Sequence, residues 1–222
     1  GSSVMGGVSL ALAAFVGALL SMILVYVLAQ QQGRASPMRL VLAGVALSYV
    51  LSAVTSYLVL RSATPGGGAA AVLTWLAGSL GGAKWEQLRL PSAVVVLATF
   101  LLLAQARPLN ALLAGDETAT GLGVNVERFR QQLFVITSLL VGAVVAVSGS
   151  IGFVGLMIPH LVRMVVGSDH RRVLPTVALG GGVYLVLVDL VGRTIMAPQE
   201  LPVGIVTAAL GGPFFLWLLR RR

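Results

Sequence analysis

The chain of 222 residues is 57% hydrophobic, carries 10% charged residues and contains no cysteine. A soluble domain carries about 25% charged residues, so this composition excludes an ordinary soluble globular protein. The lack of cysteine excludes disulfides and thiolate metal sites. The formal net charge of +8 would indicate nucleic-acid binding only if the basic residues formed one face of a soluble domain. The arginines lie between apolar runs instead, which is typical of residues that orient a protein in a membrane.

Seven apolar segments are predicted to cross a bilayer, whose hydrocarbon core of about 30 Å requires roughly 20 residues of helix. In chain order they are 8–29, 38–60, 91–106, 132–148, 152–166, 173–192 and 201–219, of which the first, second and sixth are the clearest. We therefore expect an all-α polytopic transmembrane helical bundle, with residues 1–222 forming a single domain.

The run 69–80 is too short to cross a bilayer comfortably. It is predicted to be a re-entrant or interfacial helix, with Trp75 and Trp85 near the lipid headgroups, where tryptophan is enriched. Since seven crossings are an odd number, the two ends of the chain are expected on opposite sides of the membrane.

The basic residues are divided unequally between the two predicted sides. One side has Arg34, Arg39, Arg107, Arg128, Arg130, Arg163, Arg171, Arg172, Arg220, Arg221 and Arg222, and the other has Arg61, Lys84, Arg89 and Arg193. The positive-inside rule makes the first side cytoplasmic, which puts the C-terminus of a multi-pass protein in the cytoplasm. Asp169 lies among the arginines of that side and is predicted to be a local counter-charge and a helix cap. The opening GSSVMGG favours a piece of a longer protein that lacks earlier helices.

The connection 107–131 differs from the others because it is long and polar. Gly115 and Asp116 are predicted to start a short helix, with Glu117 in a first turn that favours acidic side chains. The sequence Gly-Leu-Gly at 121–123 is predicted to end that helix.

Asn125 is predicted to cap a second short helix, whose polar side carries Glu127, Arg128 and Arg130. Two short helices joined in this way would form a compact bracket on the cytoplasmic side. A partner protein could dock on its apolar residues, which are Leu112, Leu113, Ala119, Leu122 and Val124. A solvated loop is the alternative interpretation.

Three stretches together resemble one known family. They are LLAGDETATGLGV at 112–124, GSIGFVGLMIPHLVRMVVGSDHRRVLP at 149–175 and ELPVGIVTAALGGPFFLWLL at 200–219. Their order and spacing are similar to those of the permease subunits of type II ABC importers, which transport iron chelates (siderophores), haem or cobalamin. The resemblance extends along essentially the whole chain.

The resemblance implies a transport subunit that is not itself an enzyme, lies in the cell inner (cytoplasmic) membrane and needs no cofactor. Members of the family have ten helices, and this chain resembles the last seven, preceded by the end of the third. The implied partners are two ATP-binding subunits, a second copy or a paralogous permease, membrane lipids, and a periplasmic or lipoprotein substrate-binding protein. An iron complex is the favoured substrate, with haem and cobalamin as alternatives.

The resemblance also assigns roles to particular residues. Within 107–131, the ATPase-coupling residues would be Gly115, Asp116, Glu117, Ala119, Leu122 and Gly123. Arg193 would dock the binding protein, because arginines on the outer surface of the family pair with acidic residues of that partner.

Ionisable groups inside the apolar segments need partners. Asp189 and Arg193 are four residues apart, so they are predicted to neutralise each other as a structural pair. Glu200 is predicted to lie in the first turn of the last helix. Pro159 is predicted to be a bend or hinge, and His160 a structural residue that bonds carbonyl groups freed near Pro159.

No catalytic or metal site is predicted. Ser148, Ser150 and His160 lack a carboxylate that would orient the histidine for a hydrolase. His160 and His170 lack the spacing of metal ligands. The sequence has no Gly-rich phosphate loop, so ATP would bind to another chain. An intramembrane enzyme and a structural membrane anchor are the alternative functions.

Overall fold

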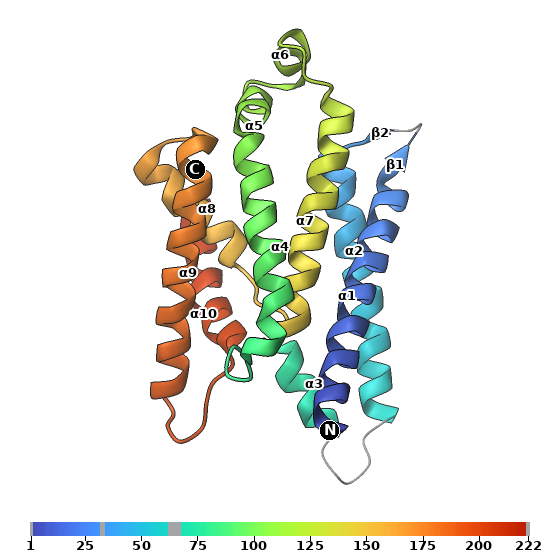
Figure 1. The fold of residues 1–222 in the computed structure, drawn as a ribbon, viewed down its shortest axis with the longest axis vertical. Helices are drawn as coiled ribbons and strands as arrows, with labels where there is room; N and C mark the ends of the chain where they lie inside the picture. The colour runs from blue at the N-terminus through green and yellow to red at the C-terminus, as the bar shows by residue number, and fades with distance from the viewer. Residues whose placement is uncertain (1, 32–33, 62–67, 221–222) are drawn as a thin grey trace.

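The computed structural model describes residues 2–31, 34–61 and 68–220, which form a bundle of long helices (Figure 1). In chain order the elements are α1 (Ser2–Ala29), β1 (Gln30–Gln31), β2 (Arg34–Ala35), α2 (Pro37–Arg61), α3 (Gly68–Leu76), α4 (Trp85–Ala104), α5 (Ala106–Leu113), α6 (Asp116–Gly121), α7 (Val126–Ser148), α8 (Val154–Val166), α9 (His170–Thr194) and α10 (Val203–Arg220). The long helices run back and forth between two ends of the bundle. One end carries α5, α6, β1 and β2 and is called the α6 end; the opposite end carries α3 and is called the α3 end.

An apolar helix occupies each of the seven segments predicted to cross the membrane. Four helices in the described part of the chain are long and apolar enough to cross a membrane: Met38–Arg61 within α2, and α4, α7 and α9. Shorter apolar helices occupy the other three predicted segments, at Ala13–Ala29, Val154–Val166 and Val203–Leu218. The run 69–80 forms only the nine-residue α3 and the start of the following loop. The all-α class predicted from the sequence is therefore correct.

The basic residues separate between the two ends as predicted. Those of β2, α5, the first turns of α2, α7 and α9 and the last turns of α8 and α10 lie at the α6 end, whereas Arg61, Lys84, Arg89 and Arg193 lie at the α3 end (Figure 1). Residue 1, Arg221 and Arg222 lie outside the described residues. The basic residues therefore lie at the two ends of the bundle, with apolar stretches of helix between them.

Two predicted helix boundaries are wrong. The crossing predicted at 132–148 and the separate short helix predicted after Asn125 are one helix, α7, because no glycine or proline interrupts the sequence between them. The crossing predicted to begin at Pro91 begins at Trp85. Residues 85–90 continue the helical pattern, and α4 tolerates Pro91 at the loss of one backbone hydrogen bond.

A two-stranded antiparallel pairing that the sequence did not predict joins α1 to α2. Gln30 pairs with Ala35 and Gln31 with Arg34. These strands follow directly on α1 and fix the approach to α2 at the α6 end (Figure 1).

Helix α8 is short and begins within the bundle. Its 13 residues span about 20 Å at 1.5 Å per residue, less than a hydrocarbon core. Irregular backbone from the ends of three helices meets at the same depth: Ser79, after α3, donates its N–H to Ser148 O at the end of α7 at 2.8 Å, and Gly204 of α10 donates to Gly78 O at 3.2 Å. Irregular backbone at this depth therefore has hydrogen-bond partners from protein, as an apolar environment requires.

The buried core lies between α8, α9 and α10. Met157, Ile158 and Val162 of α8 contact Val173 of α9, and Phe214 of α10 packs on this group. Much of the remaining apolar surface is exposed, and the most apolar stretch of α2 contains no buried residue. An exposed apolar surface of this size is typical of a helix that contacts lipid or further protein.

Candidate functional site

The α6 end carries the segment for which the sequence predicts partner docking. Gly115 precedes α6 with φ 102° and ψ 161°, a conformation that glycine adopts without strain. Asp116 and Glu117 lie in the exposed first turn of α6, as predicted. At the other end of α6, Gly123 has φ 85°.

The end of α6 is closed by two crossed backbone hydrogen bonds. Gly123 donates its N–H to Thr120 O at 2.9 Å, and Val124 donates to Ala119 O at 3.0 Å. This is the Schellman pattern, in which glycine at the left-handed position satisfies carbonyls at a helix C-terminus. The predicted stop at 121–123 is confirmed, with its geometry set by Gly123.

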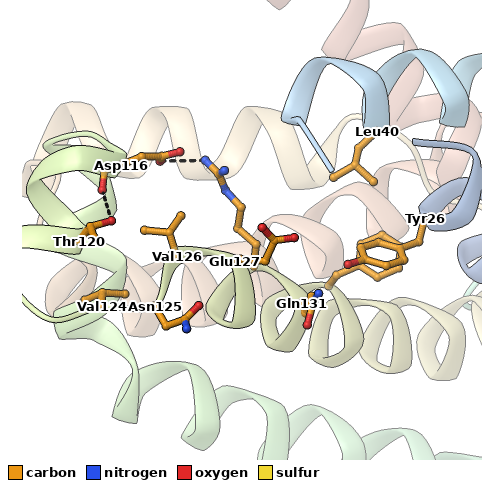
Figure 2. Close-up of a pocket in the computed structure, with 11 residues that line it drawn as sticks. Tyr26, Leu40, Asp116, Thr120, Val124, Asn125, Val126, Glu127 and Gln131 are labelled. Atoms are coloured by element: carbon orange, nitrogen blue, oxygen red, sulfur yellow. Dashed lines mark hydrogen bonds and ion pairs between the residues drawn. The ribbon is translucent and has the colours of Figure 1, made fainter. Parts of the chain in front are cut away.

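Helix α7 begins with the predicted cap. The Asn125 side chain accepts a hydrogen bond from Arg128 N at 3.1 Å. Arg130, one turn further on, reaches back to α6 and forms an ion pair with Asp116 Oδ1 at 2.9 Å. Residues 115–130 thus form the compact bracket predicted from the sequence, closed by local hydrogen bonds and one ion pair (Figure 2).

The bracket lies over a cavity of about 460 Å³ at the α6 end, lined by both polar and apolar side chains. Tyr26 of α1 and Leu40 of α2 lie at one end of the cavity, and Asp116 and Thr120 of α6 lie at the other (Figure 2). Arg130 of α7 also lines the cavity. The bracket is therefore bound firmly to α7, whereas a cavity separates it from the ends of α1 and α2.

The exposed apolar surface of the bracket differs from the predicted one. The Leu122 side chain is 70% exposed and Leu113 of α5 is 54% exposed, but Ala119 is completely buried. Leu112 and Val124 are half-buried. Ala119 is therefore a packing residue inside the bracket, because the turn at Gly123 folds Val124 back over it. The surface available to a partner centres on Leu122 and Leu113.

A second polar cluster at the α6 end joins α5 to the start of α9. Asn110 Nδ2 donates to Asp169 Oδ1 at 2.6 Å, and Asn110 Oδ1 accepts from His170 N at 2.8 Å. Asp169 caps α9 as predicted, by accepting from Arg171 N at 3.0 Å. That backbone hydrogen bond, followed by the one from Asn110, holds the pKa of Asp169 below its ordinary value. Asn110 did not stand out in the sequence, and its isolation among the apolar residues of ARPLNALL is the signal that could have drawn attention to it.

The α3 end carries the predicted pair of Asp189 and Arg193. Arg193 Nε donates to Asp189 Oδ2 at 2.8 Å, which confirms the i, i+4 pair. Arg193 Nη1 also lies 3.5 Å from Glu200 Oε1. The expectation that Glu200 lies in the first turn of α10 is wrong: α10 begins at Val203, and Glu200 is held in the preceding loop by Arg193. The Arg193 side chain is 41% exposed, so it reaches the surface between two carboxylates.

Pro159 and His160 lie in the middle of α8. The His160 ring packs edge-on against Phe214 of α10, with ring centroids 6.0 Å apart. In the described part of the chain no hydrogen bond of the His160 ring accompanies this contact, so an aromatic contact replaces the predicted hydrogen bonds. His170 instead bonds to Asn110 through its backbone, and its Nδ1 lies 2.8 Å from the same amide oxygen. The structure does not bring the two histidines into one site, and no group of three or more His, Cys, Asp or Glu residues gathers among residues 2–31, 34–61 and 68–220.

Comparisons with known proteins agree with these features. The chain is similar to the cobalamin import system permease protein BtuC of Halobacterium salinarum, with 47% identity over 95% of this chain and 56% of that protein. It is similar to the hemin transport system permease protein HmuU of Yersinia pestis, with 43% identity over 94% of this chain and 62% of that protein. It is also similar to the Fe(3+) dicitrate transport system permease protein FecD of Escherichia coli, with 41% identity over 96% of this chain and 65% of that protein. The chain thus spans between 56% and 65% of the length of these relatives.

The fold is that of a solved transporter. A structure attributed to a metal-chelate type ABC transporter in an inward-facing conformation matches with a TM-score of 0.82 and 35% sequence identity, over 96% of this chain and 71% of that chain. Residues 2–221 match the model of the FecCD transport family. The resemblance predicted from three motifs is confirmed, and the chain belongs to the FecCD transport family.

Proposed function

We propose that this chain is the membrane-spanning permease part of an ATP-driven importer for a metal chelate. The match of residues 2–221 to the FecCD transport family carries the proposal. Relatives named for cobalamin, hemin and Fe(3+) dicitrate support a substrate class that includes ferric complexes, haem and cobalamin. In this function the chain changes no covalent bond of its substrate, and separate ATPase subunits supply the energy.

The bracket is the proposed ATPase-coupling site, and the α6 end is its cytoplasmic side. The residues that build it are Gly115, Asp116, Glu117, Ala119, Leu122 and Gly123. Glycines at the two turns, the Schellman hydrogen bonds and the Asn125 cap give the bracket a defined shape, which supports a segment that passes on a displacement imposed by the ATPase. The excess of arginines at the α6 end supports the cytoplasmic assignment, including that of the C-terminus.

A second copy or a paralogous permease is the proposed neighbour of α2. The most apolar stretch of α2 has no buried residue within this chain, and its exposed side chains include Tyr49 and Tyr57. A path for the chelate between two permeases would use such a surface, and the remainder would face lipid.

Reconstitution tests the proposed function. The full-length protein would be placed in vesicles with its ATPase, and ATP hydrolysis measured with the binding protein either empty or loaded with ferric siderophore, haem or cobalamin. A chelate-dependent rise in hydrolysis with accumulation of the same chelate in the vesicles is expected. A membrane anchor would give no rise, and an intramembrane enzyme would convert its substrate without ATP. An uptake panel with the same chelates then identifies the substrate.

Arg193 is the proposed docking residue for the binding protein at the α3 end. Replacing it by glutamate would place a third carboxylate beside Asp189 and Glu200, so the affinity for a partner with acidic docking residues should fall about tenfold. The loss should be largest at low salt, because salt screens exposed charges. Arg61→Glu makes the same charge change at the same end, in the last turn of α2 on the opposite side of the bundle from α9 (Figure 1), and serves as the control. Equal affinities of the two variants for the binding protein would contradict the role of Arg193.

A further inference from the structure

Asn110 connects α5, the helix that leads into the bracket, to the start of α9 through its side-chain amide. Its Nδ2 donates to Asp169 Oδ1 at 2.6 Å, while its Oδ1 accepts from His170 N at 2.8 Å and lies 2.8 Å from His170 Nδ1. One orientation of the amide satisfies all three contacts, with the Nδ1 proton directed at Oδ1. The partners are 59 and 60 residues apart in sequence, so the cluster is a tertiary junction, not a local cap.

The position of the junction on α5 places it between the bracket and α9. Only Ala114 and Gly115 separate the end of α5 from the start of α6, and α5 packs against both α6 and α9. On its other side the bracket faces the cavity of about 460 Å³. A displacement of α6 therefore has a packed, hydrogen-bonded route to α9 through α5, in addition to its connection to α7, which packs against α1.

Helix α9 extends from the junction to the opposite end of the molecule. It continues without interruption through Pro175 from His170 to Thr194, and its 25 residues span about 38 Å. Its last turns carry Asp189 and Arg193, which pair with each other, and Arg193 also pairs with Glu200. One helix thus ends in the Asn110 junction at the α6 end and in the Arg193 ion pairs at the α3 end (Figure 1).

We propose that Asn110 is a positioning residue that couples the bracket to α9, so that α9 transmits the state of the α3 end to the ATPase side. This inference rests on the proposed transport function. In it, docking of the loaded binding protein near Arg193 displaces α9, and the hydrogen bonds of Asn110 carry that displacement through α5 into α6. A junction with a purely structural role would affect stability and assembly without affecting communication between the two ends.

The test exchanges the two sides of one hydrogen bond. Asn110→Asp places a carboxylate against Asp169, so the contact becomes repulsive when both are ionised, and assays at pH 8 favour that state. Asp169→Asn keeps an acceptor for Asn110 and for Arg171 N, since asparagine caps helices as well as aspartate does. In the unmodified protein Asp169 Oδ1 accepts from both Asn110 and Arg171 N. In the double variant Asn110→Asp/Asp169→Asn, the amide at position 169 keeps its oxygen on Arg171 N and offers its NH2 group to the carboxylate at position 110, which restores a donor opposite an acceptor.

The readouts are the affinity for the ATPase, basal ATP hydrolysis, its stimulation by the loaded binding protein, and chelate transported per ATP. For Asn110→Asp we expect normal ATPase affinity and basal hydrolysis, because Leu122 and Leu113 are untouched, with stimulation and transport per ATP lowered about fivefold or more. Asp169→Asn should behave like the unmodified protein, and the double variant should recover most of the loss, which is non-additive behaviour expected of direct partners.

Several outcomes would overturn the proposal. Normal stimulation in a folded Asn110→Asp variant would show that the junction carries no communication. Failure of the folded double variant to recover would show that this hydrogen bond is not the element involved. If Asn110→Asp does not fold, Asn110→Ala takes its place in the same assays, and normal stimulation there has the same meaning. Absence of chelate-dependent stimulation in the unmodified protein would refute the transport function itself, which distinguishes the two failures.

Discussion

Replacing Leu122 by aspartate is expected to lower ATP-driven transport at least about tenfold while the protein still folds. Leu122 is 70% exposed on the turn between α6 and α7, so the substitution creates no cavity and no internal clash. A carboxylate at the centre of an apolar docking surface must be desolvated on binding, and central interface residues typically contribute about 2–4 kcal/mol. Transport in vesicles and the affinity of the isolated ATPase subunit for the permease measure the effect.

The conservative variant Leu122→Met is the control, because it keeps an apolar side chain of similar volume at the same position and should retain both transport and affinity. Ala119 makes a useful contrast. A bulky residue there should also impair coupling, but by disrupting the buried side of the bracket, so the thermal stability of the protein should fall as well. Undiminished transport by the Leu122→Asp variant would contradict the assignment of the bracket as the coupling site.

Gly149→Ala is expected to destabilise the folded protein far more than a substitution at the exposed Leu122. Gly149 has φ 69° and ψ −166°, a region that only glycine occupies without strain, and strain of this kind costs about 1–3 kcal/mol. A Cβ atom would in addition collide with the backbone carbonyl oxygen of Trp75 and approach Gly78 Cα to 3.2 Å. Neither backbone can withdraw without breaking the contact between Ser79 and Ser148. The yield of monodisperse protein in detergent and its thermal unfolding midpoint are expected to fall sharply.

Gly182→Ala is the matched control. Gly182 lies within α9, where a Cβ atom would have no neighbour within 4 Å in this chain. Alanine is favoured over glycine in a helix interior by about 1 kcal/mol, so this variant should be as stable as the unmodified protein or more so. A similar loss of thermal stability in both variants would contradict the special role of the close backbone packing at Gly149.

Features that depend on neighbouring residues were predictable from the sequence. The caps at Gly115 and Asn125, the stop at Gly123 and the pair of Asp189 with Arg193 are each fixed within a few residues, where backbone sterics and helical spacing decide the outcome. The positions of the membrane-spanning helices were also predictable, because each of them must match the thickness of the same hydrocarbon core.

Features that depend on distant contacts were not predictable. Ala119 and Leu122 are both apolar residues of one short segment, and only the three-dimensional turn buries one and exposes the other. Asn110 meets a partner 59 residues away. Glu200 is held by Arg193 before α10 can begin. Helical spacing and hydrophobicity contain no information about such pairings. The fold was therefore predicted well, but the exposed residues of the candidate sites were predicted only in part.

The hydrogen bonds that shape the bracket have a consequence for binding energetics. The Schellman turn and the Asn125 cap connect residues no more than five positions apart, so residues 115–130 adopt their shape without help from a partner. Docking then orders few additional backbone angles, each of which would oppose association by about 1–2 kcal/mol of conformational entropy. A partner docked on the proposed coupling site would therefore gain its affinity from Leu122 and Leu113, without losing part of it to the folding of the segment that presents them.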